Sequence, residues 1–222
     1  MQFFLIICLS FFISPIFAQT INGKWQVTGT NPLKQTYKGT INITNQSHAQ
    51  VYLLDWDITN VGKYGGVGIY RNNILYASWV LQQADCGIVV YTINRSNGNL
   101  DGTWTMKNSP NAVGTETATQ KTGSKTDIMG TYQVQGTTAT GGGYRGTLTI
   151  EVGSGAGNYL VKWNLVNNPV YTGVGFIEGN ELIVAWGGGS FGVVQYVFSG
   201  NKANGKWAIK EHNGTLTENL QR

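Results

Sequence analysis

Hydrophobic and polar residues alternate with a period of two along most of the chain that follows residue 19. In the run Tyr52-Leu-Leu-Asp-Trp-Asp-Ile58, the even-numbered side chains are apolar, whereas Asp55 and Asp57 lie on the other face of an extended chain. Successive side chains of a β-strand point to opposite faces, so this alternation predicts half-buried strands. No long stretch after residue 18 carries the apolar spacing of an amphipathic helix. We therefore expect an all-β protein.

The alternating segments recur as an internal repeat. Residues 23–30 (GKWQVTGT) match residues 130–137 (GTYQVQGT) at an offset of 107, and the match continues through Gly-Val-Gly and Trp positions of both halves. The offset then falls to 105, to 103 and finally to 100, where residues 114–117 (GTET) are matched with residues 214–217 (GTLT). An offset that changes only at turn-like sites indicates duplication of one folding unit.

The repeat predicts two domains. We place a first β-domain at residues 19–121, a polar linker at 122–128 and a second β-domain at 129–222. Each repeat carries about eight alternating runs, and eight antiparallel strands in about a hundred residues suit a closed meander barrel of calycin type. We therefore expect two tandem small antiparallel β-barrels, with a pair of β-sandwiches as the alternative.

The first 18 residues form an apolar run that ends in Ala18 before a polar chain. This pattern is typical of a secretory signal peptide, although no Lys or Arg precedes the apolar stretch. The run is short and is interrupted by Pro15, so we do not expect it to span a membrane. We expect the mature chain to be secreted or periplasmic. After removal of the signal, Cys86 is the remaining cysteine, and it is available for an intermolecular disulfide that would join two copies.

The amino-acid composition argues against several classes of function. The chain has 31 glycines, only 12% charged residues and a net charge of +4, and its basic residues are spread along both halves. Because there is no dense basic run, a nucleic-acid partner is not expected. The two histidines, His48 and His212, lie in polar turn-like stretches and are too few for a three-histidine zinc site. The sequence therefore assigns no metal, no cofactor and no catalytic residue.

Two local patterns look like catalytic motifs, and we interpret both as structural. Asp55 and Asp57 would lie about 7 Å apart on one strand face, near the separation that inverting glycosidases use. The second repeat has Lys162 and Asn164 at the matched positions, so we interpret the acidic pair as solvated surface. The stretch 141–146 reads Gly-x-Gly-x-x-Gly, but it leads into a predicted strand and so lacks the geometry of a phosphate-binding loop. We expect a protein that is not an enzyme.

The inward faces of the predicted strands are rich in tryptophan and tyrosine. All seven tryptophans lie in repeat-related strands, and glycines such as Gly102 and Gly205 interrupt the same faces. An eight-stranded barrel is just wide enough for its own side chains or for one small ligand, so these aromatic residues either fill the cores or line a ligand cavity. A cavity of several hundred cubic ångström would favour a ligand carrier, and a filled core would favour binding at the surface.

A series of motifs in the second repeat carries a family resemblance. It consists of Gly-Thr-Tyr-x-Val-x-Gly from Gly130, Tyr-x-Gly-Thr from Tyr144, Tyr-x-Val-x-Trp from Tyr159 and Gly-x-Trp ending at Trp207. The series resembles a tandem all-β repeat of small exported bacterial proteins, some of which are labelled fibronectin-binding. The resemblance implies a bacterial source, no catalytic residues and a partner in the extracellular matrix or the cell envelope.

These observations lead to one main functional expectation. We expect an exported, non-enzymatic binding or adhesion-type protein that contacts a macromolecular or surface partner, and the sequence does not identify its binding residues. The alternative is a small-ligand carrier that uses the interior of a barrel.

Overall fold

The computed structural model describes residues 20–81, 83–124, 127–153 and 157–222. These ranges contain β-strands and no helix. The first eight strands are β1 (Gly23–Thr30), β2 (Thr36–Asn45), β3 (Val51–Ile58), β4 (Gly62–Arg71), β5 (Ile74–Leu81), β6 (Cys86–Ile93), β7 (Leu100–Met106) and β8 (Ser109–Gln120). The remaining strands are β9 (Gly130–Thr137), β10 (Gly143–Val152), β11 (Asn158–Leu165), β12 (Val170–Glu178), β13 (Glu181–Gly187), β14 (Phe191–Ser199), β15 (Lys202–Ile209) and β16 (Leu216–Gln221). The described ranges hold no apolar helix of membrane-spanning length. The predicted signal peptide, residues 1–18, lies outside them.

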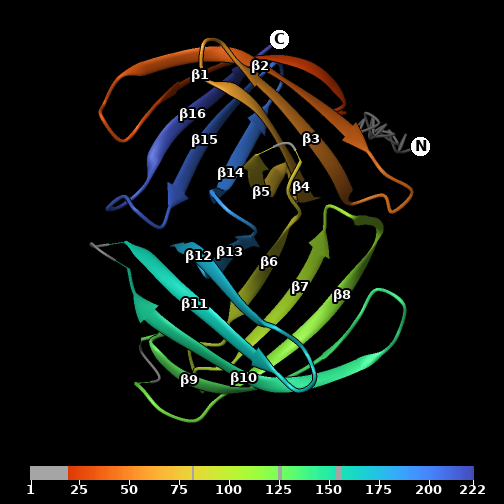
Figure 1. The fold of residues 1–222 in the computed structure, drawn as a ribbon, viewed down its shortest axis with the longest axis vertical. Coiled ribbons are helices and arrows are strands. Elements are labelled where there is room, and N and C mark those ends of the chain that lie inside the picture. Colours follow the sequence, from red (N-terminus) through yellow and green to blue (C-terminus); the bar gives the residue numbers. More distant parts are fainter. Residues whose placement is uncertain (1–19, 82, 125–126, 154–156) are drawn as a thin grey trace, which may run out of the picture.

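The strands close into two antiparallel eight-stranded barrels, which confirms the predicted fold class. Around the first barrel the order is β1-β16-β15-β14-β5-β4-β3-β2, and around the second it is β10-β11-β12-β13-β6-β7-β8-β9. Figure 1 shows the barrels stacked one above the other, with β4, β5 and β14 of the first facing β6, β12 and β13 of the second. Closure of both sheets pairs every strand on two sides and so removes the exposed edges that invite aggregation.

The boundaries of the barrels differ from the predicted domains. The second barrel is one continuous segment that runs from β6 to β13, whereas the first combines β1–β5 with β14–β16. The prediction of one barrel in residues 19–121 and another in residues 129–222 was therefore wrong. Residues 122–128, predicted to link two domains, instead connect β8 to β9, which pair with each other inside the second barrel. Each repeat contributes five consecutive strands to one barrel and three to the other.

Duplication explains why the alternating pattern could not show that each repeat gives three of its strands to the other barrel. Strand β5 pairs with β14 and strand β13 pairs with β6, whereas one barrel per repeat would pair β5 with β6 and β13 with β14. Strands β6 and β14 are repeat-related, since Gly87 and Tyr91 match Gly192 and Tyr196. Val89 likewise matches Val194, so the two strands share Gly, Val and Tyr on their inward faces. The local pattern therefore specifies the strand type without specifying which copy supplies it.

The two barrels pack against each other through the outer faces of their sheets. Strands at this junction are buried on both faces, and β6 is buried at seven of its eight positions. The junction cluster consists of Val51, Val67, Ile69, Tyr76, Ile88, Val90, Val174, Phe176, Ile183, Ala185, Val193 and Ala208. Ion pairs between described residues cross from one barrel to the other, Arg71 with Glu181 and Lys206 with Glu178. An apolar junction of this kind holds the barrels in a fixed relation.

Each barrel is closed at one end by the residues that precede β1 or β9. In the first barrel Ile21 is fully buried, and its carbonyl oxygen accepts a hydrogen bond of 2.9 Å from the indole N–H of Trp25. In the second barrel the carbonyl oxygen of Ile128 accepts a hydrogen bond of 2.7 Å from the hydroxyl of Tyr132. Apolar side chains fill the interior at this end.

Candidate functional site

Each barrel interior opens into a pocket at the end opposite its closed end. The pocket of the first barrel has a volume of about 230 Å³, and that of the second barrel has a volume of about 360 Å³. Asn31, directly after β1, lines the mouth of the first pocket, and Thr138, directly after β9, lines the mouth of the second. Because β1 and β9 start at the closed ends, the two pockets lie at corresponding ends of their barrels.

The two pockets are lined by the same types of aromatic and acidic residue. The first is lined by Tyr37, Trp56, Tyr64, Trp79, Trp207 and Glu218, and the second by Tyr144, Trp163, Tyr171, Trp186, Trp104 and Glu116. In each set the first four residues come from one repeat, and the last tryptophan and the glutamate come from the other. Each pocket is therefore assembled from both repeats by the exchange of strands.

A buried carboxylate forms the polar centre of the first pocket. Glu218 Oε1 accepts a hydrogen bond of 3.0 Å from the indole N–H of Trp56 and another from the hydroxyl of Tyr196, and Oε2 accepts one from the hydroxyl of Tyr37. Hydrogen bonds to an ionised acceptor are about twice as strong as neutral ones. Three donors thus hold this carboxylate in one orientation at the inner end of the pocket.

The second pocket repeats this cluster. Glu116 Oε1 accepts hydrogen bonds from the indole N–H of Trp163, at 3.1 Å, and from the hydroxyl of Tyr91. Glu116 Oε2 accepts a hydrogen bond of 3.0 Å from the hydroxyl of Tyr144. The donors are one tryptophan and two tyrosines in both barrels, so the duplication has preserved the whole hydrogen-bond network.

Burial dominates the ionisation of these groups. Loss of hydration raises the pKa of Glu116 and of Glu218 above 4.5, and the hydrogen bonds from the tyrosines and the tryptophan oppose this rise. Burial, together with the nearby carboxylate, raises the pKa of Tyr91 and of Tyr196 well above 10.0. The tyrosines therefore stay protonated and act as hydrogen-bond donors to the carboxyl group of each cluster.

Glycines on adjacent strands make room for the rings of the clusters. A Cβ atom at Gly205 would lie 2.6 Å from Cδ1 of Tyr196, and a Cβ atom at Gly102 would lie 2.7 Å from Cδ1 of Tyr91. The ring–glycine pairs are Tyr196 on Gly205, Tyr91 on Gly102, Trp79 on Gly192, Trp186 on Gly87, Tyr37 on Gly29 and Tyr144 on Gly136. Any larger residue would displace a ring, so these close approaches account for part of the high glycine content.

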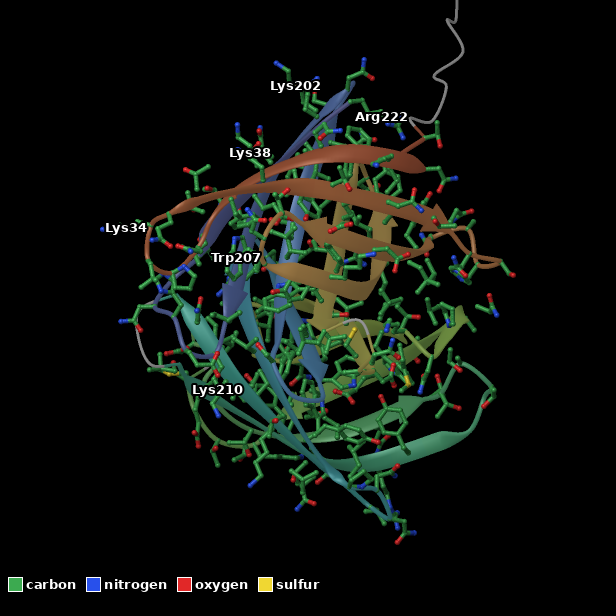
Figure 2. All side chains as sticks on the ribbon, turned by 45° about the horizontal axis from the view of Figure 1, so that its top comes forward. Lys34, Lys38, Lys202, Trp207, Lys210 and Arg222 are labelled. Carbon is green, nitrogen blue, oxygen red and sulfur yellow. The ribbon has the colours of Figure 1, made fainter. Side chains whose placement is uncertain are left out.

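Two buried indole N–H groups in the pockets have no hydrogen-bond partner among the residues that the structure describes. They belong to Trp207 in the first pocket and to Trp104 in the second, at repeat-related positions. Figure 2 shows Trp207 within the first barrel, and its side chain is only 8% exposed. The Trp104 indole opposes the rise in the pKa of Tyr144 that burial causes, but its N–H makes no hydrogen bond of normal geometry to a described residue. Leaving a buried hydrogen-bond donor unpaired costs about 1–3 kcal/mol, so a hydrogen-bond acceptor beside either indole would be stabilising.

The pockets differ in the residue that pairs with this tryptophan across the sheet. Leu216 pairs with Trp207 in the first barrel, whereas Gly114 pairs with Trp104 in the second. Gly114 has no side chain, and the Trp104 ring packs directly over it, since a Cβ atom there would lie 2.3 Å from Cε2 of that ring.

The candidate residues from the sequence lie outside the two clusters. Asp55 and Asp57 are exposed on the outer face of β3, and Oδ2 of Asp57 lies 4.0 Å from Nζ of Lys63. His48 lies in the turn between β2 and β3, and His212 in the turn between β15 and β16. Within the part of the chain that the structure describes, no three His, Cys, Asp or Glu side chains are grouped as metal ligands.

Two other sequence features have structural roles. The glycine-rich stretch 141–146 leads into β10, and its Gly142 and Gly143 line the mouth of the second pocket. Cys86 lies at the junction of the barrels, where it is 2% exposed and its Sγ accepts a hydrogen bond of 3.2 Å from Ser78. Burial raises the pKa of the Cys86 thiol to about 11. An intermolecular disulfide through Cys86 therefore stays a prediction, and one that burial disfavours.

Sequence comparison between the repeats missed the two glutamates. At an offset of 100, Glu116 is matched with Leu216. The strand register instead places Glu116 opposite Gly102 and Glu218 opposite Gly205, which makes the glutamates equivalent at an offset of 102. The signal that could have found them is the Thr-Glu pair shared by residues 115–116 and 217–218.

The sequence matches no protein-family model and no curated protein.

Proposed function

We propose that this protein is a carrier that binds one small organic ligand in each of its two barrel pockets. The observation that carries the proposal is the duplicated cluster of a buried glutamate with two tyrosines and a tryptophan. Replacing a buried ionic group by apolar residues of similar size is often neutral or stabilising, so packing alone gives little reason to keep such a cluster. Two copies of it, each beside an unpaired indole N–H, support a role in ligand recognition.

The volumes of the pockets indicate the size of the ligand. Ligand pockets commonly enclose about 300–1,000 Å³. The first pocket, at about 230 Å³, is smaller than that range, and the second, at about 360 Å³, lies in its lowest part. We therefore propose a compact ligand of few heavy atoms rather than a long acyl chain. Contact with a macromolecular or surface partner, which the family resemblance implies, stays a prediction.

Native mass spectrometry with a library of small neutral, cationic and anionic compounds tests this function. We expect some compounds to form complexes with two molecules bound per chain. Trp79→Leu alters the first pocket and Trp186→Leu alters the second, so each variant should bind one molecule, whereas the exposed Asp55→Asn control should still bind two. Failure of every compound to bind, or two molecules bound by both tryptophan variants, would contradict the proposal.

A further inference from the structure

The charge of the pockets restricts the chemistry of the ligand. Among the described residues that line the pockets, the only charged side chain is Glu218 in the first pocket and Glu116 in the second. Lysines of the first barrel such as Lys34 and Lys38 are exposed and extend away from its outer surface (Figure 2). A carboxylate in a poorly hydrated pocket attracts a cation more strongly than it would in water, and it repels an anion. Each pocket therefore favours a positively charged group.

The arrangement of the aromatic rings indicates the shape of that group. In the first pocket the ring of Trp79 meets Tyr64 at 84° and Trp207 at 72°, with ring centroids 5.5 Å and 6.0 Å apart. In the second pocket the ring of Trp186 meets Trp104 at 68° and a second tryptophan at 60°. The rings of each pair meet edge to face, so these pairs form no parallel slot into which a flat ligand could stack. The differently oriented rings that line each pocket instead suit a compact, rounded cation such as a quaternary ammonium group.

A second polar requirement comes from the unpaired tryptophans. The indole N–H groups of Trp104 and Trp207 are donors only, so a cation alone cannot satisfy them. A ligand atom that accepts a hydrogen bond would remove the cost of leaving each donor unpaired. The ligand therefore needs an oxygen acceptor in addition to its positive charge.

We infer that each pocket binds a small organic cation of the quaternary ammonium class that also carries a hydroxyl or carbonyl oxygen. The cationic group lies among the aromatic faces near the glutamate, and the oxygen accepts the hydrogen bond from the unpaired indole. This inference rests on the proposed carrier function and adds the class of ligand to it.

Isothermal titration calorimetry with three probes tests the inference on the intact protein. Choline carries both the cation and the oxygen, 3,3-dimethylbutan-1-ol is its neutral isostere, and tetramethylammonium lacks the oxygen. We expect choline to bind at two sites per chain and at least about tenfold more tightly than the neutral isostere, since only a cation is attracted by the aromatic faces and by the carboxylate. Tetramethylammonium should bind more weakly than choline because it leaves the indole unpaired.

Variants of the two glutamates localise the effect. Glu116→Gln should abolish choline binding in the second pocket and Glu218→Gln in the first, so each should reduce the number of choline sites from two to one. Asp55→Asn removes an exposed carboxylate from the outer face of β3 and should keep both sites. If a glutamine variant does not fold, Trp207→Phe replaces it. That variant keeps an aromatic ring without the N–H, and it should weaken choline binding in the first pocket more than tetramethylammonium binding.

The outcomes separate the ligand class from the carrier function. Equal affinity for choline and its neutral isostere, or no choline binding at all, would overturn the inference about the cation. Neutral or anionic compounds bound at two sites in the mass-spectrometric screen would then still support the carrier. Choline binding unaffected by Glu116→Gln and Glu218→Gln would place the cation outside the pockets and would likewise overturn the inference.

Discussion

Replacement of Gly205 by alanine should displace the tyrosine that holds the Glu218 carboxylate. The new Cβ atom would lie 2.6 Å from Cδ1 of Tyr196 and 2.2 Å from the backbone oxygen of Glu218, and both distances are too short for a non-bonded contact. Either the ring or the strand must move. Overpacking of a well-packed interior costs about 1–3 kcal/mol, and each kcal/mol lowers Tm by about 2–4 °C in a chain of this size. We therefore expect Tm to fall by about 2–12 °C.

Urea unfolding followed by near-ultraviolet circular dichroism measures the change in the free energy of unfolding. Gly188→Ala is the matched control, because no atom lies within 4 Å of a Cβ atom at that position. This control should change the free energy of unfolding by no more than about 1 kcal/mol, in the stabilising direction, since alanine restricts the unfolded chain. If Gly205→Ala proves as stable as Gly188→Ala, the close approach of Tyr196 to the β15 backbone does not constrain the fold, and the reasoning is refuted.

Three further predictions concern the fold and its ionisation. A fragment of residues 84–189 should fold alone with native-like near-ultraviolet circular dichroism, because it carries every strand of the second barrel, and an unfolded fragment would mean that the barrels fold only together. Trp163→Ala should lower the free energy of unfolding in urea by about 3–5 kcal/mol, because the side chain is 5% exposed and bonded to Glu116, and a loss under about 1 kcal/mol would contradict its place in the core. Burial raises the pKa of Glu116 and Glu218 above 4.5 in the folded state, so the folded state binds their protons more tightly than the unfolded state does. Proton binding at the two glutamates therefore stabilises the fold below about pH 4.5, and this stabilisation is lost as the pH rises through the raised pKa values. The Tm of wild type should therefore fall relative to that of the Glu116→Gln, Glu218→Gln double variant over this rise in pH, and parallel Tm curves would contradict the raised pKa values.

The strand pattern of this protein is strongly encoded in local sequence. Alternation in residues 159–165 predicts one buried face, and Val161 and Trp163 on that face are 2% and 5% exposed. The structure confirms the predicted count of about eight strands per repeat and the closure into barrels. These features could be predicted because the alternation of side chains and the residues that form turns are local properties of the sequence.

The connection of strands into barrels depends on information that the local pattern does not carry. Strands β6 and β14 carry the same Gly, Val and Tyr residues on their inward faces, so this local pattern does not decide which of them pairs with β5. Both faces of the junction strands are buried, and residues such as Val67 and Ile183 lie in that shared cluster. The near-continuous apolar runs in these strands are the local sign of a covered outer face.

The glutamates at the centres of the pockets could not be predicted from the sequence for a different reason. A lone glutamate in an alternating strand is interpreted as surface unless its face is known, and Glu116 is followed by Thr117, which is exposed. Only the strand register shows that Glu116 and Glu218 share the inward face with Ala118 and Leu220. The aromatic partners were identified as inward-facing, but whether they fill a core or line a cavity depends on the volume that the closed barrel leaves.

The most direct test of the central claim is the ¹H–¹⁵N spectrum of the seven tryptophan indole groups during titration with a bound ligand. We expect the signals of Trp104 and Trp207 to shift most, since their N–H groups have no partner among the described residues until a ligand supplies one. Trp25 at the closed end of the first barrel donates to Ile21 and should not shift. Shifts at Trp25 equal to those at Trp104 and Trp207, or no shift at either pocket residue while the ligand binds, would contradict the claim that the two pockets are the binding sites.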